Sequence, residues 1–177
     1  MKNCFNRQIQ WETDHYGIDA FRKDKIIRIS RSKEEEKAYS WLGYKEKDFG
    51  EMCNIRKEID EDITNGIIES DILKIIGIDK SFDHPEAIEY ALNKKHKKFM
   101  SFSGSSILGY QKEFDFKLKF MYCNHLKYPY LLEIEREEIE YNHIGKHVKD
   151  IESFIAKYNL EGLKIKEEPP TLLYNTL

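Results

Sequence analysis

The chain has 177 residues, of which 40% are hydrophobic, and this suits one globular domain with a sizeable core. Charged residues make up 34% of the chain but leave a net charge of only −3, so no basic excess favours binding to nucleic acid. No apolar run approaches the ~20 residues of a membrane-spanning helix, and Met1–Asn6 has no signal-peptide pattern. The three scattered cysteines indicate reduced thiols. We therefore expect a cytoplasmic protein without a membrane span.

The first third of the chain has the alternation of apolar and polar residues that is typical of strands. Gln8–Trp11 is expected to be a strand that leads into a turn-like polar region, Glu12–Gly17. The charge run Ser32–Lys37 is expected to form a hairpin loop. Further strands are predicted at Lys25–Arg31, Tyr39–Lys47 and Asn54–Asp60.

The middle of the chain is expected to be helical. Ser70–Ile76 carries four large apolar residues, and Gly77 follows as a terminator. A second helix is expected to begin near Pro85, with Asp83 as its N-cap. Gly104 and its neighbouring serines predict a flexible loop after this helix.

Strands return in the last third of the chain. Phe114–Tyr122 and Tyr130–Glu137 both alternate with a period of two. Apolar residues spaced by three and four positions predict a helix over Ile144–Tyr158. Thr171–Tyr174 is expected to be a short extended tail.

The strand Tyr130–Glu137 places Leu132 and Ile134 on one side, and Glu133 and Glu135 on the other. Neighbouring carboxylates on one face repel each other, so water, cationic side chains or a bound metal must offset the repulsion. Which of these applies decides whether the strand is part of an enzyme's site.

Several predicted strands share this character of one apolar and one charged face. An antiparallel sheet with one hydrated side explains the pattern. The sharper alternative is a curled sheet whose charged faces line a cavity, with helices packed outside. In that cavity basic side chains would hold phosphate oxygens and acids would hold Mg²⁺ or Mn²⁺, which is what phosphoryl transfer needs. The basic residues are Arg28, Lys45, Arg56 and Lys117, and the acidic residues are Glu58, Glu133 and Glu135.

The order of these segments resembles the CYTH superfamily, the triphosphate-tunnel fold of class IV adenylate cyclases and thiamine triphosphatases. Leu131–Glu135 is similar to the family's F-L-E-I-E motif, and Arg56–Asp60 to R-x-E-x-E. Lys25–Ser30 resembles A-L-R-I-R, and Gln10–Asp14 resembles the strand end Q-x-Y-Y/F-D-T-P. Tyr44 and Lys45 fall where T-x-K-G is expected.

The resemblance implies an α+β fold, with an antiparallel β-barrel or strongly curved sheet, over a single CYTH-like domain, 1–177. It implies a protein that binds or acts on nucleoside triphosphate, thiamine triphosphate or tripolyphosphate, as a triphosphatase or cyclase that depends on divalent metal if active. Arg28, Lys45, Arg56 and Lys117 would bind phosphates, Glu133 and Glu135 would hold Mg²⁺ or Mn²⁺, and Glu58 would assist catalysis. The alternative is a catalytically degenerate module that binds nucleotide, polyphosphate or a partner protein without turnover.

The family's opening strand, E-x-E-x-K, has no counterpart ahead of Gln10. An incomplete barrel would expose strand edges, which favour pairing with another chain. We therefore expect a homodimer formed by edge-strand pairing, or an edge covered by residues 1–10 or 167–177. Gln8–Trp11 is the expected edge strand, beside Glu133 and Glu135.

Two other patterns suggest chemistry. His143 and His147 have the i, i+4 spacing of metal ligands, although an amphipathic helix flank explains them as well. The basic run Lys94–Lys98 could contact phosphate or nucleic acid, but a solvated helix end favoured by the helix dipole is the simpler interpretation.

Overall fold

The computed structural model describes residues 7–50, 53–137 and 140–176. The chain divides into two compact units, which are treated separately below. The N-terminal unit comprises Ile9–Gly50 and Ile55–Gly104, and most of the C-terminal unit lies in Ser105–Leu177.

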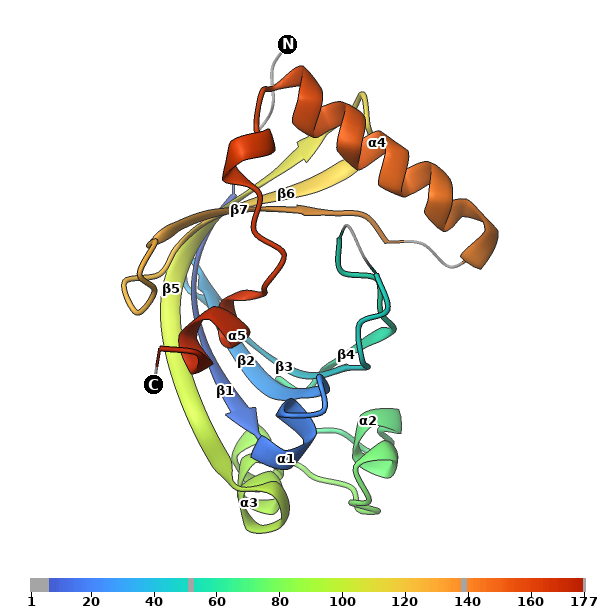
Figure 1. Cartoon of the computed structure of the whole chain (residues 1–177). Helices are drawn as coiled ribbons and strands as arrows, with labels where there is room; N and C mark the ends of the chain where they lie inside the picture. The colour runs from blue at the N-terminus through green and yellow to red at the C-terminus, as the bar shows by residue number, and fades with distance from the viewer. Residues whose placement is uncertain (1–6, 51–52, 138–139, 177) are drawn as a thin grey trace. The chain divides into compact units, whose positions relative to one another are not determined.

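The described residues form an α+β fold around an antiparallel seven-stranded sheet, as predicted (Figure 1). The strand order is β4-β3-β2-β1-β5-β6-β7, and β5 contributes to both units. The strands are β1 (Arg7–Tyr16), β2 (Ile26–Glu34), β3 (Lys37–Lys45), β4 (Glu58–Asp62), β5 (Lys98–Gln111), β6 (Phe116–Tyr122) and β7 (Tyr130–Glu135).

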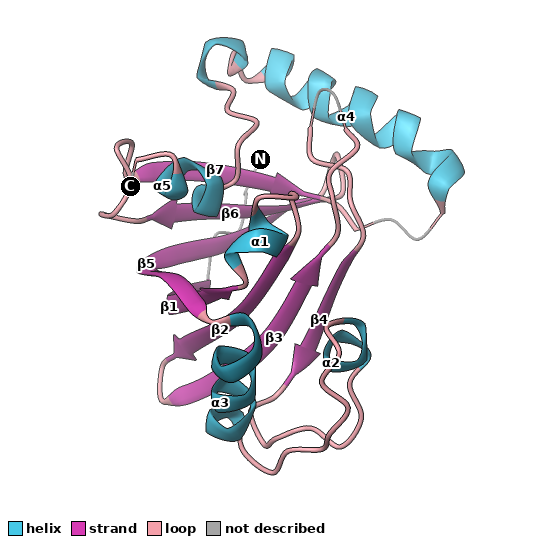
Figure 2. Cartoon of the chain, turned by 60° about the horizontal axis from the view of Figure 1, so that its bottom comes forward, coloured by secondary structure: helices cyan, strands magenta, loops and turns pink. Residues whose placement is uncertain are grey.

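The N-terminal unit buries one face of β1–β4 against two helices, α2 (Asp71–Ile75) and α3 (Pro85–His96) (Figure 2). Alternate residues of β2 and β3 supply this face, and the helices contribute their isoleucines and leucines. The fully buried members of this core include Ile29, Leu42, Ile63, Ile72, Ile88 and Leu92. This face carries the apolar residues of the strands together with Asp14 and Arg31, whereas Arg28 and Lys45 lie on the other face.

Local signals explain where these helices begin. The Ser70 side chain accepts a hydrogen bond from Leu73 N at 2.9 Å, which caps α2. The prediction of Asp83 as the cap of α3 is wrong, since His84 is the N-cap residue and Pro85 is the first helical residue. A short helix, α1 (Ile18–Phe21), joins β1 to β2.

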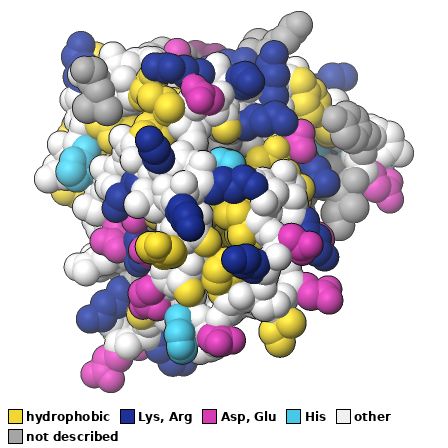
Figure 3. Space-filling view, turned by 90° about the horizontal axis from the view of Figure 1, so that it is seen from below, with side chains coloured by type: hydrophobic (Ala, Val, Ile, Leu, Met, Phe, Trp, Pro, Cys, Tyr) yellow, Lys and Arg dark blue, Asp and Glu magenta, His cyan; other side chains and the backbone are white. Residues whose placement is uncertain are grey.

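The basic run at the end of α3 is exposed. Figure 3 shows one face of the molecule, on which basic, acidic and apolar side chains are intermingled rather than gathered by sign. Lys94 and Lys95, in the last turn of α3, fit a solvated helix end, whereas Lys98 lies in β5 and forms an ion pair with Asp14 at 3.4 Å.

The C-terminal unit covers the apolar face of β6 with α4 (Ile144–Lys157), which confirms the predicted long helix. Phe154 of α4 packs edge-on against Phe116, with ring centroids 5.7 Å apart. A short helix, α5 (Pro169–Tyr174), follows, so the prediction of an extended tail is wrong. The two prolines at its start have φ values that suit a first helical turn. Two single-turn 3₁₀ segments, Tyr141–His143 and Glu161–Leu163, flank α4.

Three predictions about strands and loops are wrong. Gln8–Trp11 is not at an edge, since β1 lies between β2 and β5 and the sheet ends at β4 and β7. β1 also continues through the expected turn to Tyr16. The serines around Gly104 form the middle of β5 rather than a loop. At Glu12–Tyr16 and around Gly104, neighbouring strands complete the hydrogen bonds of a segment with weak local strand propensity. Residues 1–6, part of the expected edge cover 1–10, lie outside the described residues.

The boundaries of two other segments also differ from expectation. The strand predicted over Asn54–Asp60 begins at Glu58 and not at Asn54. The expected hairpin loop at Ser32–Lys37 shrinks to a turn at Glu35 and Glu36, because β2 and β3 pair up to Glu34 and Lys37. Among the described helices, none has the length and apolar content that crossing a bilayer requires.

Candidate functional site

The charged face of β1–β4 in the N-terminal unit brings several predicted residues together. Residues that lie directly opposite in an antiparallel register point to the same face. His15 lies opposite Arg28, and Arg28 lies opposite Gly43. Lys45 lies opposite Glu58 at the end of the same face. We call the surface formed by His15, Arg28, Gly43, Lys45, Glu58 and Asp60 the cationic face.

Acidic side chains accompany each cation on or beside this face. The Lys45 ammonium lies 2.9 Å from Glu58, and its side chain is only 12% exposed. The Arg28 guanidinium lies 3.5 Å from Asp60, at the limit of a hydrogen bond. The two carboxylates are 40% and 45% exposed, so they can turn into solvent while the cations stay in place.

Arg56 is the third predicted phosphate-binding residue of this unit. It belongs to the segment ahead of β4, and its guanidinium lies 3.7 Å from Asp24. Its side chain is 5% exposed. The structure therefore gives Arg56 a buried position and an acidic neighbour of its own.

Gly43 makes the close approach of Arg28 and Asp60 possible. A Cβ atom at Gly43 would lie 2.6 Å from Asp60 Oδ1 and 2.8 Å from Arg28 Nε. Both distances are shorter than ordinary contacts, so any larger residue would displace the guanidinium. A glycine in a strand interior is otherwise unfavourable, and here it marks close side-chain packing across three strands.

His15 was not predicted, and it is the most unusual residue of the cationic face. It is 1% exposed, and its ring stacks on Phe102 with centroids 5.4 Å apart and planes 13° apart. Neither ring nitrogen has a hydrogen-bond partner within the described structure, and the same holds for the buried Arg28 Nε. Burial, reinforced by the positive charges of Arg28 and Lys45, lowers the pKa of His15 from 6.5 to about 3. No local sequence signal marked this position, because Glu12–His15 is polar at every residue and was expected to form a turn.

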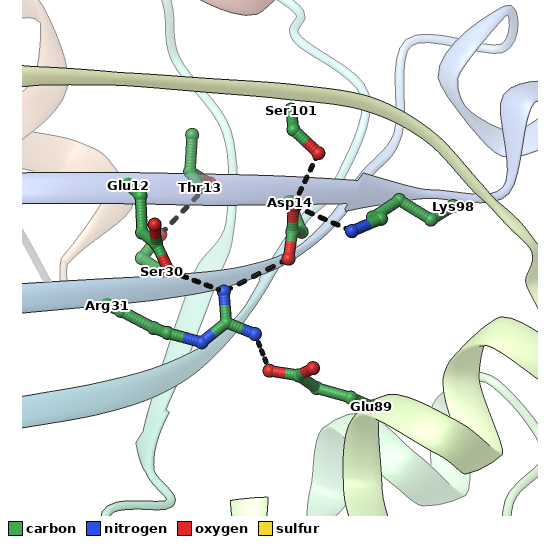
Figure 4. A network of polar contacts seen from close by, with 8 residues as sticks. All are labelled: Glu12, Thr13, Asp14, Ser30, Arg31, Glu89, Lys98 and Ser101. Atoms are coloured by element: carbon green, nitrogen blue, oxygen red, sulfur yellow. Dashed lines mark hydrogen bonds and ion pairs between the residues drawn. The ribbon is translucent and has the colours of Figure 1, made fainter. Parts of the chain in front are cut away.

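The opposite face of the same strands carries a polar network that sequence reasoning also missed (Figure 4). Asp14 accepts hydrogen bonds from Arg31 at 3.0 Å and from Ser101 at 2.5 Å, and it lies 3.4 Å from Lys98. Arg31 also pairs with Glu89 of α3.

Burial alone would raise the pKa of Asp14, but the hydrogen bonds from Ser101 and Arg31 and the charge of Lys98 together hold it below its usual value. The network therefore ties β1 to β2, β5 and α3. We assign it to stability rather than to binding.

In the C-terminal unit, lysines of β6 lie beside the carboxylates of β7. Glu133 lies opposite Lys119, with 2.8 Å between the charged groups, and Glu135 lies opposite Lys117. Lys117 also pairs with Glu137. Cationic side chains thus offset the repulsion on β7.

A divalent cation needs several oxygen ligands and little competing positive charge. The lysine beside Glu133 opposes such a site. Within residues 7–50, 53–137 and 140–176, no group of three or more His, Cys, Asp or Glu side chains could hold a metal ion. The carboxylates of β7 as they lie here do not fit Mg²⁺ or Mn²⁺.

His143, the N-cap residue of α4, and His147 within this helix do not gain a third ligand in the described part of the chain either. The rings of His143 and His147 lie 6.4 Å apart in an edge-on arrangement. This geometry supports the interpretation of an amphipathic helix flank.

The predicted site residues therefore fall in two units. Arg28, Lys45, Arg56 and Glu58 belong to the N-terminal unit, and Lys117, Glu133 and Glu135 belong to the C-terminal unit. Arg28, Lys45 and Glu58 lie with His15 on one face, and Arg56 lies apart from them beside Asp24.

Comparison with known proteins finds a solved structure with a similar fold. No family model and no curated protein matches the chain. The fold resembles that of the PH1819 protein from Pyrococcus horikoshii OT3. The two structures align with a TM-score of 0.65 at 17% sequence identity, over 86% of this chain and 76% of PH1819. At this identity the likeness to PH1819 shows the fold, and it assigns no residue a role.

Proposed function

We propose that the chain binds triphosphate-containing ligands through the cationic face of its N-terminal unit. The observation that carries the proposal is the cross-strand pair of His15 and Arg28, in which both ring nitrogens of His15 and Nε of Arg28 are buried and have no hydrogen-bond partner in the described structure. Buried polar groups in native proteins are nearly always hydrogen-bonded, so each exception suggests water or a ligand.

The chemistry of the face favours an anion. Arg28 Nε is a donor that cannot lose its proton, and Lys45 lies within the same face, two residues along β3 from Gly43. Phosphate oxygens accept strong, charge-assisted hydrogen bonds from such groups. A chain of linked phosphates would span several cations at once, whereas orthophosphate would not.

The acids of the face fit this proposal. In the unliganded protein Glu58 and Asp60 balance the cations. A bound polyanion would repel both carboxylates, which are exposed enough to turn towards water. The exchange of one anionic partner for another keeps the cost of binding low.

Binding without turnover is the form of this proposal that we favour. The resemblance to CYTH proteins implies catalysis with Mg²⁺ or Mn²⁺ held by Glu133 and Glu135, assisted by Glu58. The ion pair between Glu133 and Lys119 counts against such a metal site. A degenerate relative that keeps the phosphate-binding cations and lacks the metal fits these contacts better.

Calorimetric titration with tripolyphosphate and orthophosphate tests the proposal. We expect tripolyphosphate to bind at least tenfold more tightly. Replacing Arg28 or Lys45 by glutamine removes a charged hydrogen bond that contributes about 1.5–3 kcal/mol, so affinity should fall about 10- to 100-fold.

The matched control is Arg22→Gln, which removes a positive charge from an exposed helix position in the same unit. Equal binding of the two phosphates, or equal loss in the control, would contradict the proposal. Metal-dependent release of phosphate by the purified chain, abolished by Glu135→Gln, would instead support the catalytic alternative.

A further inference from the structure

One face of the sheet in the C-terminal unit has no charged side chain among its described residues. Residues that pair directly across antiparallel strands point to the same face, and so does every second residue along a strand. This face consists of Ser105, Ile107, Gly109 and Gln111 of β5, Phe116, Leu118, Phe120 and Tyr122 of β6, and Tyr130, Leu132 and Ile134 of β7. The lysines of β6 and the glutamates of β7 lie on the other face.

The helix α4 covers only one end of this apolar face. Phe154 of α4 forms a buried cluster with Phe116 and Leu118. Two and four residues further along β6 this cover has ended, since Phe120 is 42% and Tyr122 is 41% exposed. Their cross-strand neighbours are exposed as well, to between 40% and 62%. We call the uncovered end the bare patch; it consists of Ile107, Phe120, Tyr122, Tyr130 and Leu132.

The rings of the bare patch are ordered against one another. Phe120 and Tyr130 stack with centroids 6.1 Å apart, and the centroids of Tyr122 and Tyr130 are 5.2 Å apart. Tyr128, in the turn that joins β6 to β7, adds another exposed ring. Since a Phe or Tyr side chain offers about 150–250 Å², the patch and Tyr128 together expose on the order of 500 Å². The largest apolar patch of a monomeric protein is of this size, and it is often functional.

The charges beside the bare patch favour an acidic partner. Residues 116–132 contain three lysines and neither aspartate nor glutamate. Lys117 and Lys119 lie on the other face, opposite Glu135 and Glu133. Lys127 is exposed in the turn next to the patch, with its ammonium 5.5 Å from the ring centre of Tyr128. The rim of the patch at this turn is therefore cationic.

We propose that the bare patch binds an amphipathic α-helix of a partner protein, whose acidic flank lies beside Lys127. The same apolar face already binds one such helix, because α4 packs on its other end through apolar residues spaced by three and four positions. The bare patch begins two residues, about 7 Å, beyond Leu118, and neighbouring helices pack about 8–10 Å apart. A second helix would therefore continue the interface that α4 begins.

This mode of binding uses the patch as a groove for apolar side chains. An amphipathic helix places its apolar residues at positions i, i+3, i+4 and i+7, and these enter the groove while the polar side faces water. Because the rings of Phe120, Tyr122 and Tyr130 hold one another in place, binding costs little side-chain entropy. The inference is independent of the proposed function, which concerns the N-terminal unit.

Two other occupants fit the patch less well. A second copy of the chain would need about 800 Å² on each partner for a stable dimer, which is more than the patch offers. A lipid surface binds through several cationic residues beside the apolar ones, whereas the turn at residues 123–129 contains one lysine. Exposed apolar residues that are scattered singly need no partner, but the residues of the bare patch are contiguous across three strands.

A set of matched peptides tests the proposal on the full chain. The probe is a dye-labelled helical peptide of about five turns, with leucine at the apolar positions and glutamate along one flank. A second peptide has lysine in place of each glutamate, and a third has the composition of the first in scrambled order. Fluorescence polarisation measures binding. We expect the glutamate peptide to bind about three- to tenfold more tightly than the lysine peptide, and the scrambled peptide not to bind. The net charge of −3 opposes this order, so non-specific attraction does not produce it.

Substitutions locate the bound peptide. Phe120→Ala and Tyr130→Ala should each weaken binding about 10- to 30-fold, because central aromatic residues dominate such interfaces. Lys127→Glu should reverse the preference between the two ordered peptides. The control is Tyr90→Ala, which removes a 72% exposed ring from α3 of the N-terminal unit and should change nothing. Melting curves and unchanged affinity for tripolyphosphate establish that each variant is folded.

The other outcomes refute the proposal and leave the proposed function untouched. Absence of binding, equal binding of the scrambled peptide, or equal loss in Tyr90→Ala would show that the patch is no helix site. Tighter binding of the lysine peptide would contradict the acidic flank. A dimer in light scattering that Phe120→Ala separates would make a second copy the occupant. Sedimentation with vesicles of phosphatidylcholine and phosphatidylserine, lost in Phe120→Ala, would make it a lipid surface.

Discussion

His15 should make the stability of the protein depend on pH in a window where few side chains titrate. In the folded protein its pKa is lowered to about 3, and in the unfolded chain it returns to 6.5. Below pH 6.5 the unfolded chain therefore takes up a proton that the folded protein does not. The folded state keeps its full stability above this pH and loses it as the pH falls towards 3.

The size of the effect follows from proton linkage. Each pH unit within this window should cost about 1.4 kcal/mol of unfolding free energy, so lowering the pH from 6.5 to about 5 should cost about 2 kcal/mol. His15 is 1% exposed, so solvent screening should not reduce this figure greatly. Asp14 does not contribute in this window, because its pKa is lowered and its contribution is lost only below 3.8.

The variant His15→Phe removes the titration and keeps a ring that can stack on Phe102. It also removes two buried nitrogens that have no partner in the described structure, so its stability near pH 7.5 should equal or exceed that of the parent. Urea denaturation at about pH 7.5 and about pH 5 measures both quantities. The variant should lose about 2 kcal/mol less than the parent on acidification.

The control is His84→Gln, which removes an exposed histidine from the same unit. Its acid sensitivity should match that of the parent. If His15→Phe and the parent lose the same free energy between the two pH values, then His15 is not the buried neutral group described here and the reasoning is wrong.

Three further predictions concern single contacts, and one concerns assembly. Gly43→Ala should cost about 1–3 kcal/mol of unfolding free energy and weaken tripolyphosphate binding, because the methyl group collides with the neighbouring guanidinium; unchanged calorimetry and melting would contradict this. Asp14→Asn should destabilise the protein by about 1–3 kcal/mol at neutral pH, and the difference in denaturation should shrink below pH 3.8. The resemblance predicts that Mn²⁺ raises the melting temperature and that Glu133→Gln/Glu135→Gln abolishes the response; the lysines of β6 lead us to expect no response in either protein. If the edge of β7 pairs with a second copy, Leu132→Lys, at a 41% exposed position, should turn a dimer into a monomer in light scattering.

The sequence determined which residues share a face. The period of two in β2 and β3 placed Arg28 and Lys45 on one face of the sheet and the core residues Ile29 and Leu42 on the other. The spacing of apolar residues in α4 predicted which of its side chains are buried. These features depend only on the regular period of a single strand or helix, which the sequence of that segment contains. The class of fold follows from them.

Tertiary structure alone decided which strands are neighbours. Gln8–Trp11 was predicted to be an edge strand, yet β1 lies inside the sheet. The serines around Gly104 belong to β5 because neighbouring strands supply hydrogen-bond partners for their backbone. The same pairing sets His15 against Arg28 and sets lysines against Glu133 and Glu135. Contacts of this kind join residues far apart in the chain, so no local pattern encodes them. The register of the strands therefore decides whether a charged residue faces water or an oppositely charged side chain. The register in turn depends on the whole fold.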